Sequence, residues 1–213
     1  MIYSKMSMIG ESMQKIVINH WMNIIKKCNN YDNIKLEEIK YGLTGLYMTI
    51  SKLIVILLIS LILKITKNTL ILLVLFNIIR LTSFGIHAKK SWICLISSII
   101  IFICFPILLN LFHSNLFFRI IVGAINVIHI FIYSPADTKK RPIVSLKRRK
   151  VYKYISTSIA ITFVIVSLII NNYYIQNSLI FVLIIQNILI SPITYKILKE
   201  PYNNYTKYLK TSA

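Results

Sequence analysis

A histidine and a cysteine stand seven residues apart, at His87 and Cys94, in the short polar break between two long apolar segments. An imidazole can take the proton of a thiol, and the thiolate is the nucleophile in cysteine peptidases and acyl-transfer enzymes. The cations Arg80, Lys89 and Lys90 are their neighbours in the sequence and can stabilise negative charge on the sulfur. The pair therefore predicts thiol acyl-transfer chemistry.

The spacing of this pair sets a geometric condition. Seven residues of unbroken helix separate two side chains by about 10.5 Å of rise, which is too far for a hydrogen bond. We therefore expect the chain to bend, with Gly85 supplying backbone freedom just before His87 and the polar residues 88–91 able to turn. Arg80 has two interpretations: a donor to the oxyanion formed during attack, with backbone N–H groups near Cys94 as the alternative, or a side chain that snorkels to lipid headgroups.

The composition indicates the elements that must position these groups. Of the 213 residues, 56% are hydrophobic, which is typical of a polytopic membrane protein and argues against a soluble domain. Because a helical span needs about 20 apolar residues, the chain has room for six. We predict an all-α bundle of about six transmembrane helices, at residues 42–63, 70–86, 91–112, 116–133, 154–170 and 178–198.

No composition shift marks a second domain, so residues 1–213 are expected to form one integral-membrane domain. It comprises an N-terminal region (1–40), the bundle (42–198) and a tail (199–213). Apolar residues recur at helical spacing near the start of the chain and predict an amphipathic helix, which either lies in the membrane interface or packs on the bundle. These residues are Ile9, Met13, Ile16, Val17, His20, Trp21 and Ile24.

The distribution of Lys and Arg predicts the orientation, because cytoplasmic loops carry the excess of positive charge. Basic residues gather before the first span, after the second, after the fourth and after the sixth. Both termini and the His87–Cys94 segment are therefore expected on the cytoplasmic side of the membrane. Lys64, Lys67 and Arg119 are the exceptions.

Other candidate residues have ordinary explanations. Cys104 is expected to be a packed apolar thiol, and His129 is expected to bond between helices. Asp137, two residues after Pro135, is typical of a helix-ending or loop-stabilising residue. Pro106 and Pro192 are expected to kink their spans. No arrangement of His, Cys and carboxylates has metal-ligand spacing, so we predict neither a metal nor another cofactor.

Two sequence signatures resemble those of one family. Residues 80–94, RLTSFGIHAKKSWIC, are similar to the signature of the accessory gene regulator B family of membrane cysteine endopeptidases, which process precursors of cyclic quorum-sensing peptides in bacteria. Residues 134–143, SPADTKKRPI, resemble its second signature. Family members often have two adjacent glycines before the histidine, whereas this chain has Phe84-Gly85.

The resemblance implies a role for each matching residue. Cys94 would be the nucleophile and His87 its general base, with Arg80 and Gly85 in supporting positions. The thiolate would attack a precursor carbonyl and release the C-terminal tail. A thiol or hydroxyl of the bound precursor would then close a thiolactone or lactone ring.

The partners follow from the resemblance and from the charge pattern. The resemblance implies a peptide precursor with an amphipathic N-terminal region and an acidic C-terminal tail. The basic residues Lys139, Lys140 and Arg141 could dock that tail, bind lipid headgroups or only set the topology. We expect a bacterial cell membrane protein that binds the bilayer and no nucleic acid, and a homodimer by resemblance. The alternatives are a transporter of a peptide or small solute and a noncatalytic assembly partner.

Overall fold

The computed structural model describes residues 2–28, 31–86, 91–138, 142–206 and 208. Throughout these residues the regular structure is helical, and the only β pairing is one isolated bridge. The predicted all-α membrane bundle is therefore confirmed. The chain divides into two compact units, Met1–Leu58 and Ile59–Ala213, which are described separately.

The first unit contains α1 (Ile2–Cys28) and most of α2 (Asn33–Ile62). The predicted N-terminal helix is present as α1. Its buried side chains are Ile18 and Met22, whereas Met13, Ile16 and Trp21 of the predicted apolar face are exposed. The exposed apolar face fits a helix that contacts lipid, and its placement in the interface stays a prediction.

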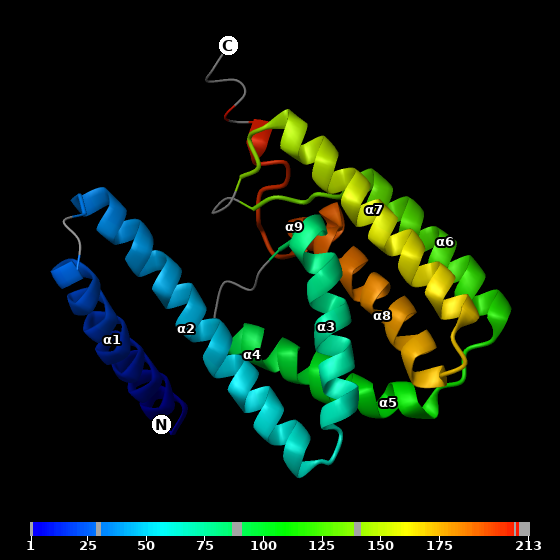
Figure 1. The fold of residues 1–213 in the computed structure, drawn as a ribbon, viewed down its shortest axis with the longest axis horizontal. Helices are drawn as coiled ribbons and strands as arrows, with labels where there is room; N and C mark the ends of the chain where they lie inside the picture. Colours follow the sequence, from blue (N-terminus) through cyan, green and yellow to red (C-terminus); the bar gives the residue numbers. More distant parts are fainter. Residues whose placement is uncertain (1, 29–30, 87–90, 139–141, 207, 209–213) are drawn as a thin grey trace. The chain divides into compact units, whose positions relative to one another are not determined.

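The second unit is built around the most buried span, α8 (Tyr173–Ile190). This helix contacts α3 (Thr66–Ser83), α6 (Leu116–Tyr133) and α7 (Leu146–Ile169), and Figure 1 shows it between α3 on one side and α6 and α7 on the other. It also contacts α5 (Phe105–Leu111) and α9 (Pro192–Ile197). Because apolar residues lie all round α8, it can be buried on several faces.

Side-chain caps define where several of these helices begin. The Asn115 carboxamide oxygen accepts from the Phe118 N–H at 2.7 Å, and Asn172 caps α8 through the Ile175 N–H at 3.1 Å. An Asn at this position satisfies a backbone donor that the first turn of the helix leaves without a partner. The short connections 112–115 and 170–172 are therefore placed by local chemistry.

The third predicted span consists of three consecutive segments. These are α4 (Ser91–Ile99), the π-helical turn η1 (Ile100–Cys104) and α5, with Pro106 in the first turn of α5. A π turn is a recognised site of distortion within a helix. Thr69 of α3 donates to the Phe102 carbonyl inside η1 at 3.0 Å. The irregularity expected at Pro106 is thus a π turn that precedes the proline.

Several observed helix ends differ from the predicted ones. The second span was expected to continue to about residue 86, and α3 ends at Ser83. The span predicted at 154–170 begins earlier, at Leu146, so its basic residues form the first turns of α7. The last span ends at Ile190, because Ser191 and Pro192 begin the separate helix α9 rather than kinking α8. Proline fits the first turn of a helix, where no intrahelical partner is needed for its nitrogen.

The number of spans also differs from the prediction. Among the described residues, five helices are long and apolar enough to cross a membrane: Asn33–Ile62, Trp92–Leu111, Leu116–Tyr133, Leu146–Ile169 and Tyr173–Ile190. Helix α3, the second predicted span, is not among them. It has 18 residues and includes Lys67, Asn68, Asn77 and Arg80, which lower its mean hydropathy. It is nevertheless packed against α7 and α8.

Candidate functional site

The candidate site begins where α3 stops. Phe84 has φ 56° and ψ −131°, and Gly85 has φ 109°, so both residues have left-handed backbone conformations that L side chains rarely adopt. Two such residues in succession turn the chain sharply out of the helix. The backbone freedom expected just before His87 is therefore used at residues 84–85. The turn expected at residues 88–91, which would bring His87 and Cys94 together, falls mostly outside the described residues and stays a prediction.

The chain after this bend is held on two sides by backbone hydrogen bonds. The Gly85 N–H donates to the Ala136 carbonyl at 2.8 Å, and the Ala136 N–H donates to the Ser83 carbonyl at 3.0 Å. On the other side the Ile86 N–H donates to the Leu189 carbonyl, near the end of α8, at 3.0 Å. The two sequence signatures are thus joined directly through Ala136.

Arg80 clamps the same bend with its guanidinium group. Nη1 donates to the Phe84 carbonyl at 2.6 Å, and Nη2 donates to the carbonyls of Gly85 at 3.1 Å and Ile86 at 2.5 Å. These three carbonyls belong to the residues immediately before His87. One half-buried cation thereby fixes the backbone that leads to the predicted base. Hydrogen bonds to a charged donor are stronger than neutral ones.

Gly85 leaves no room for a side chain at this clamp. A Cβ atom at residue 85 would lie 2.6 Å from Arg80 Nη1, 2.8 Å from the Leu189 carbonyl oxygen and 3.1 Å from Ile190 Cγ2. The first two contacts are shorter than van der Waals packing allows. Glycine is therefore required both by the positive φ angle and by the close approach of two neighbours.

Cys94 lies in the first turn of α4 and is half-buried. Its backbone carbonyl accepts from Ser98 Oγ at 2.7 Å and from Ser97 Oγ at 3.0 Å. Negative charge on the thiol would interact favourably with the Arg80 guanidinium. The backbone N–H groups in the first turn of a helix also stabilise negative charge that lies near them. His87 lies outside the described residues.

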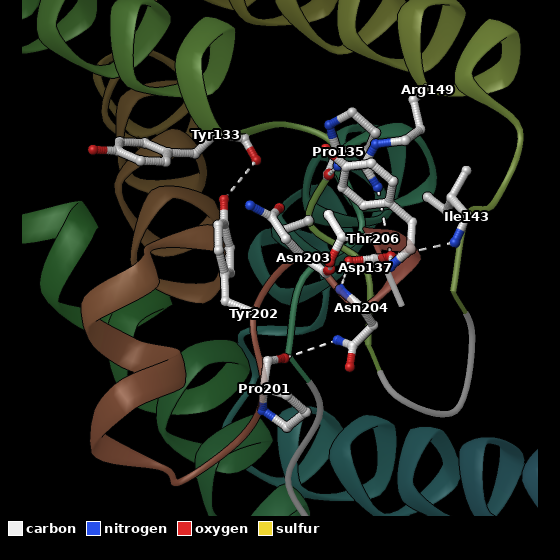
Figure 2. A network of polar contacts seen from close by, with 12 residues as sticks. Tyr133, Pro135, Asp137, Ile143, Arg149, Pro201, Tyr202, Asn203, Asn204 and Thr206 are labelled. Atoms are coloured by element: carbon white, nitrogen blue, oxygen red, sulfur yellow. Dashed lines mark hydrogen bonds and ion pairs between the residues drawn. The ribbon is translucent and has the colours of Figure 1, made fainter. Parts of the chain in front are cut away.

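The second signature is anchored by Asp137, which is 1% exposed (Figure 2). Its carboxylate accepts from the backbone N–H groups of Tyr205 at 2.9 Å, Asn204 at 3.1 Å and Ile143 at 3.4 Å. Arg149 Nη1 is 3.5 Å from the carboxylate, and its guanidinium lies 3.7 Å from the centroid of the Tyr205 ring. Asp137 thus ties the C-terminal segment to the loop that pairs with Gly85.

Two tyrosines complete this anchor. The Tyr195 hydroxyl donates to the Asp137 carbonyl at 3.0 Å, and the Tyr202 hydroxyl donates to the Tyr133 carbonyl at 3.4 Å. Burial raises the pKa of Tyr195 and raises the pKa of Tyr202 to about 12. Both phenols are therefore neutral donors at physiological pH.

Comparison with known proteins agrees with the two signatures. The sequence model of the accessory gene regulator B family matches residues 18–190. Accessory gene regulator protein B of Staphylococcus aureus strain Newman is 38% identical over 160 residues, which cover 75% of this chain and 84% of that protein. An AgrB-like protein of Clostridium acetobutylicum is 30% identical over 180 residues, covering 84% of this chain and 86% of that protein. No solved structure matches the chain.

The chain belongs to the accessory gene regulator B family. This membership links it to accessory gene regulator quorum sensing, and its apolar helices make it a multi-pass membrane protein. The family signature therefore has a physical basis in this chain, because Arg80, Gly85 and Ala136 meet at one bend. Where family members often have a second glycine, this chain has Phe84 at a positive φ angle.

The structure describes some of the predicted site residues and leaves others undescribed. Arg80, Gly85 and Cys94 lie as given above. Lys139, Lys140 and Arg141 lie outside the described residues, as His87 does, so their roles stay predictions. Across the described part of the chain, no three His, Cys, Asp or Glu side chains gather as metal ligands.

Sequence reasoning missed one residue at this family site. Gln186 of α8 is fully buried, and its Nε2 donates to the Phe84 carbonyl at 2.7 Å. Its Oε1 has no hydrogen-bond partner among the described residues. The detectable signal was a polar pair, Gln186-Asn187, within a long apolar run. Asn187 accounts for the helix-to-helix bond expected of His129, since its Oδ1 lies 3.1 Å from His129 Nδ1.

Proposed function

We propose that this chain is a membrane cysteine endopeptidase that cleaves the C-terminal tail from a quorum-sensing peptide precursor and promotes its cyclisation. The observation that carries the proposal is the contact of Arg80 with the chain before His87. Its guanidinium binds the three carbonyls that lead to His87. One cation thus fixes the backbone from which the predicted base extends.

The proposed reaction has two acyl-transfer steps. His87 takes the proton of Cys94, and the thiolate attacks a peptide carbonyl of the precursor. The carbon–nitrogen bond breaks, the imidazolium protonates the leaving amine, and a thioester to Cys94 remains. A thiol of the bound precursor then attacks this thioester and regenerates Cys94, which gives a thiolactone; a hydroxyl would give a lactone. The second step conserves the activated acyl group, so it needs no ATP.

The contacts of Arg80 favour a positioning role over direct stabilisation of the oxyanion. Nη1 and Nη2 are already bonded to backbone carbonyls. We therefore assign the oxyanion donors to backbone N–H groups in the first turn of α4, beside Cys94. Arg80 would hold the base in place and balance negative charge on the sulfur. Snorkelling to lipid does not account for its three backbone contacts.

Substrate recognition is proposed to use charge and the membrane surface. Lys139, Lys140 and Arg141 would bind the acidic tail of the precursor, and the bilayer would hold its amphipathic region. The positions of the basic segments would put both termini and the site on the cytoplasmic side, where thiols stay reduced. A homodimer remains part of the proposal by resemblance.

The transporter alternative has less support in the described helices. The buried polar residues of α8 form two groups, at 176–178 and 186–187. Residues 179–185 between them are all apolar and span about 10.5 Å of helix. This arrangement does not provide a continuous polar path along α8. An experiment that measures cleavage and export of the peptide separately can nevertheless distinguish the two functions.

The test is co-expression of this chain with its cognate precursor, followed by mass spectrometry of the peptide in cells and in medium. The proposal expects a truncated precursor with wild type and no truncation with Cys94→Ala or His87→Ala. The matched controls Cys28→Ala and Cys104→Ala should remain active. Processing by Cys94→Ala would refute the proposed nucleophile. Normal truncation with loss of export in both variants would favour transport.

A further inference from the structure

A buried cation lies at the end of the bundle opposite the candidate site. Arg119, in the first turn of α6, is 7% exposed. Arg119 is separated by most of α6, about 22 Å of helical rise, from Ser134, where the second signature begins. The proposed peptidase reaction therefore has no use for Arg119, and its placement needs a separate explanation.

The described bonds of Arg119 go to neutral groups. Nη1 donates to the Ser114 carbonyl at 2.8 Å, to Ser114 Oγ at 3.3 Å and to Gln176 Oε1 at 2.8 Å. Nε is buried and has no hydrogen-bond partner among the described residues. A buried charge without a counter-charge costs several kcal/mol. A negatively charged ligand would remove that cost.

The connections at this end of the second unit contain no acid. The three connections here are residues 63–65, 112–115 and 170–172, and none contains Asp or Glu. Lys64 and Lys67 lie beside the start of α3, which the Tyr174 hydroxyl joins to α8 through the Asn68 carbonyl at 2.6 Å. The three exceptions to the positive-inside pattern, Lys64, Lys67 and Arg119, therefore share one end of the second unit.

An apolar cavity lies near Arg119, at the same end of the unit. It has a volume of about 430 Å³ and lies between α5, α6 and α8. Phe105, Leu109, Phe112, Phe118, Asn177 and Phe181 contribute to its lining. Asn177 connects the cavity to the cation, because its Oδ1 accepts from Ser114 Oγ at 2.5 Å and Ser114 in turn accepts from Arg119.

We propose that Arg119 and this cavity form a binding site for one anionic phospholipid. The phosphodiester lies against Arg119, an acyl chain occupies the cavity, and Lys64 and Lys67 add positive charge at the same end of the unit. Arg binds phosphate oxygens through paired donors, and basic pockets between transmembrane helices bind anionic headgroups. A lipid fits better than a soluble anion because the cavity is apolar and lies between membrane-spanning helices.

The test uses phosphatidylglycerol and phosphatidylcholine that carry the same photoreactive acyl chain. The purified full-length protein is crosslinked in vesicles with each probe, and the labelled peptides are identified by mass spectrometry. We expect phosphatidylglycerol to label α5, α6 and α8 around the cavity at least about tenfold more than phosphatidylcholine, a difference of about 1.4 kcal/mol. Equal labelling by the two lipids would overturn the proposal.

Variants separate this site from general charge attraction. Arg119→Gln should abolish the preference for phosphatidylglycerol at the cavity. Lys64→Gln/Lys67→Gln should reduce the preference without altering the buried residue, which covers the case in which Arg119→Gln does not fold. The matched control Lys147→Gln/Lys150→Gln removes two charges from α7 and should leave cavity labelling unchanged. An equal loss in this control, or full displacement by excess inorganic phosphate, would contradict a specific lipid site.

Discussion

Replacing Gly85 by alanine is the sharpest test of the bend at the end of α3. Gly85 has φ 109°, a region that costs an L residue on the order of 1–3 kcal/mol. The new methyl group would also lie 2.6 Å from Arg80 Nη1 and 2.8 Å from the Leu189 carbonyl oxygen. Relieving these overlaps by moving the guanidinium group loses charged hydrogen bonds worth roughly 1.5–3 kcal/mol each.

The combined strain on the bend is therefore on the order of 3–5 kcal/mol. Part of this strain should appear as displacement of the segment before His87, because the Arg80 contacts that hold this segment are the ones the new methyl group disturbs. A misplacement of about 1 Å in a catalytic group can reduce a rate by about 100-fold. We expect Gly85→Ala to lower the precursor cleavage rate by about that factor.

The chain provides matched controls for the same substitution. A Cβ at Gly42 or Gly45 would have no neighbour within 4 Å, so alanine there should leave cleavage unchanged. A Cβ at Gly123 would lie 2.9 Å from Val164 Cγ1, which is a side-chain contact far from the bend. Gly123→Ala should therefore lower the melting temperature with little effect on the rate. Wild-type cleavage by Gly85→Ala would refute the clamp.

Three further predictions concern Arg80 and the Asp137 anchor. Arg80→Lys keeps the charge but cannot reach three carbonyls at once, so cleavage should fall at least about tenfold while the melting temperature changes little; equal activity would show that charge alone suffices. Asp137→Asn leaves Arg149 without its counter-charge and should destabilise the protein by about 3 kcal/mol in denaturant unfolding, and the double variant Asp137→Asn/Arg149→Met should recover part of this loss. A destabilisation of Asp137→Asn that the double variant does not reduce would contradict the pair. Burial raises the pKa of Tyr202 to about 12, against an ordinary value of about 10, so the contribution of the neutral phenol to stability is complete below pH 10 and is lost as the pH rises toward 12. The melting temperature of wild type should therefore fall more steeply than that of Tyr202→Phe between pH 10 and 12. Parallel curves for the two proteins would refute this assignment.

The helical membrane architecture could be predicted because it depends on local composition. Long apolar runs can cross a bilayer only as helices or closed barrels, since every backbone polar group needs an internal partner. The range predicted at 116–133 agrees with α6, where Asn115 caps one end and Ser134-Pro135 follows the other. The boundaries of α3 and α8 were less predictable, because Phe84 and Ser191 end these helices through backbone conformation and capping.

The candidate site was predictable only in part. The residue types of Arg80, Gly85 and Cys94 indicated the chemistry, and the need for a bend followed from helical rise. The sequence did not settle the role of Arg80, since an arginine can serve either as a donor to the oxyanion or as a side chain that contacts lipid headgroups. Gln186 was missed because its partner, the Phe84 carbonyl, is 102 residues away in the chain.

The amino-acid sequence by itself determined the membrane character, the helices and the choice of candidate reactive side chains, because each depends on hydropathy or on side-chain chemistry within a short segment. Only the tertiary structure decided that Ala136 pairs with Gly85, that Arg80 binds the carbonyls before His87, and that Asp137 holds the C-terminal segment. These contacts join residues from different helices and loops. Their formation depends on how the helices pack, which no local pattern specifies.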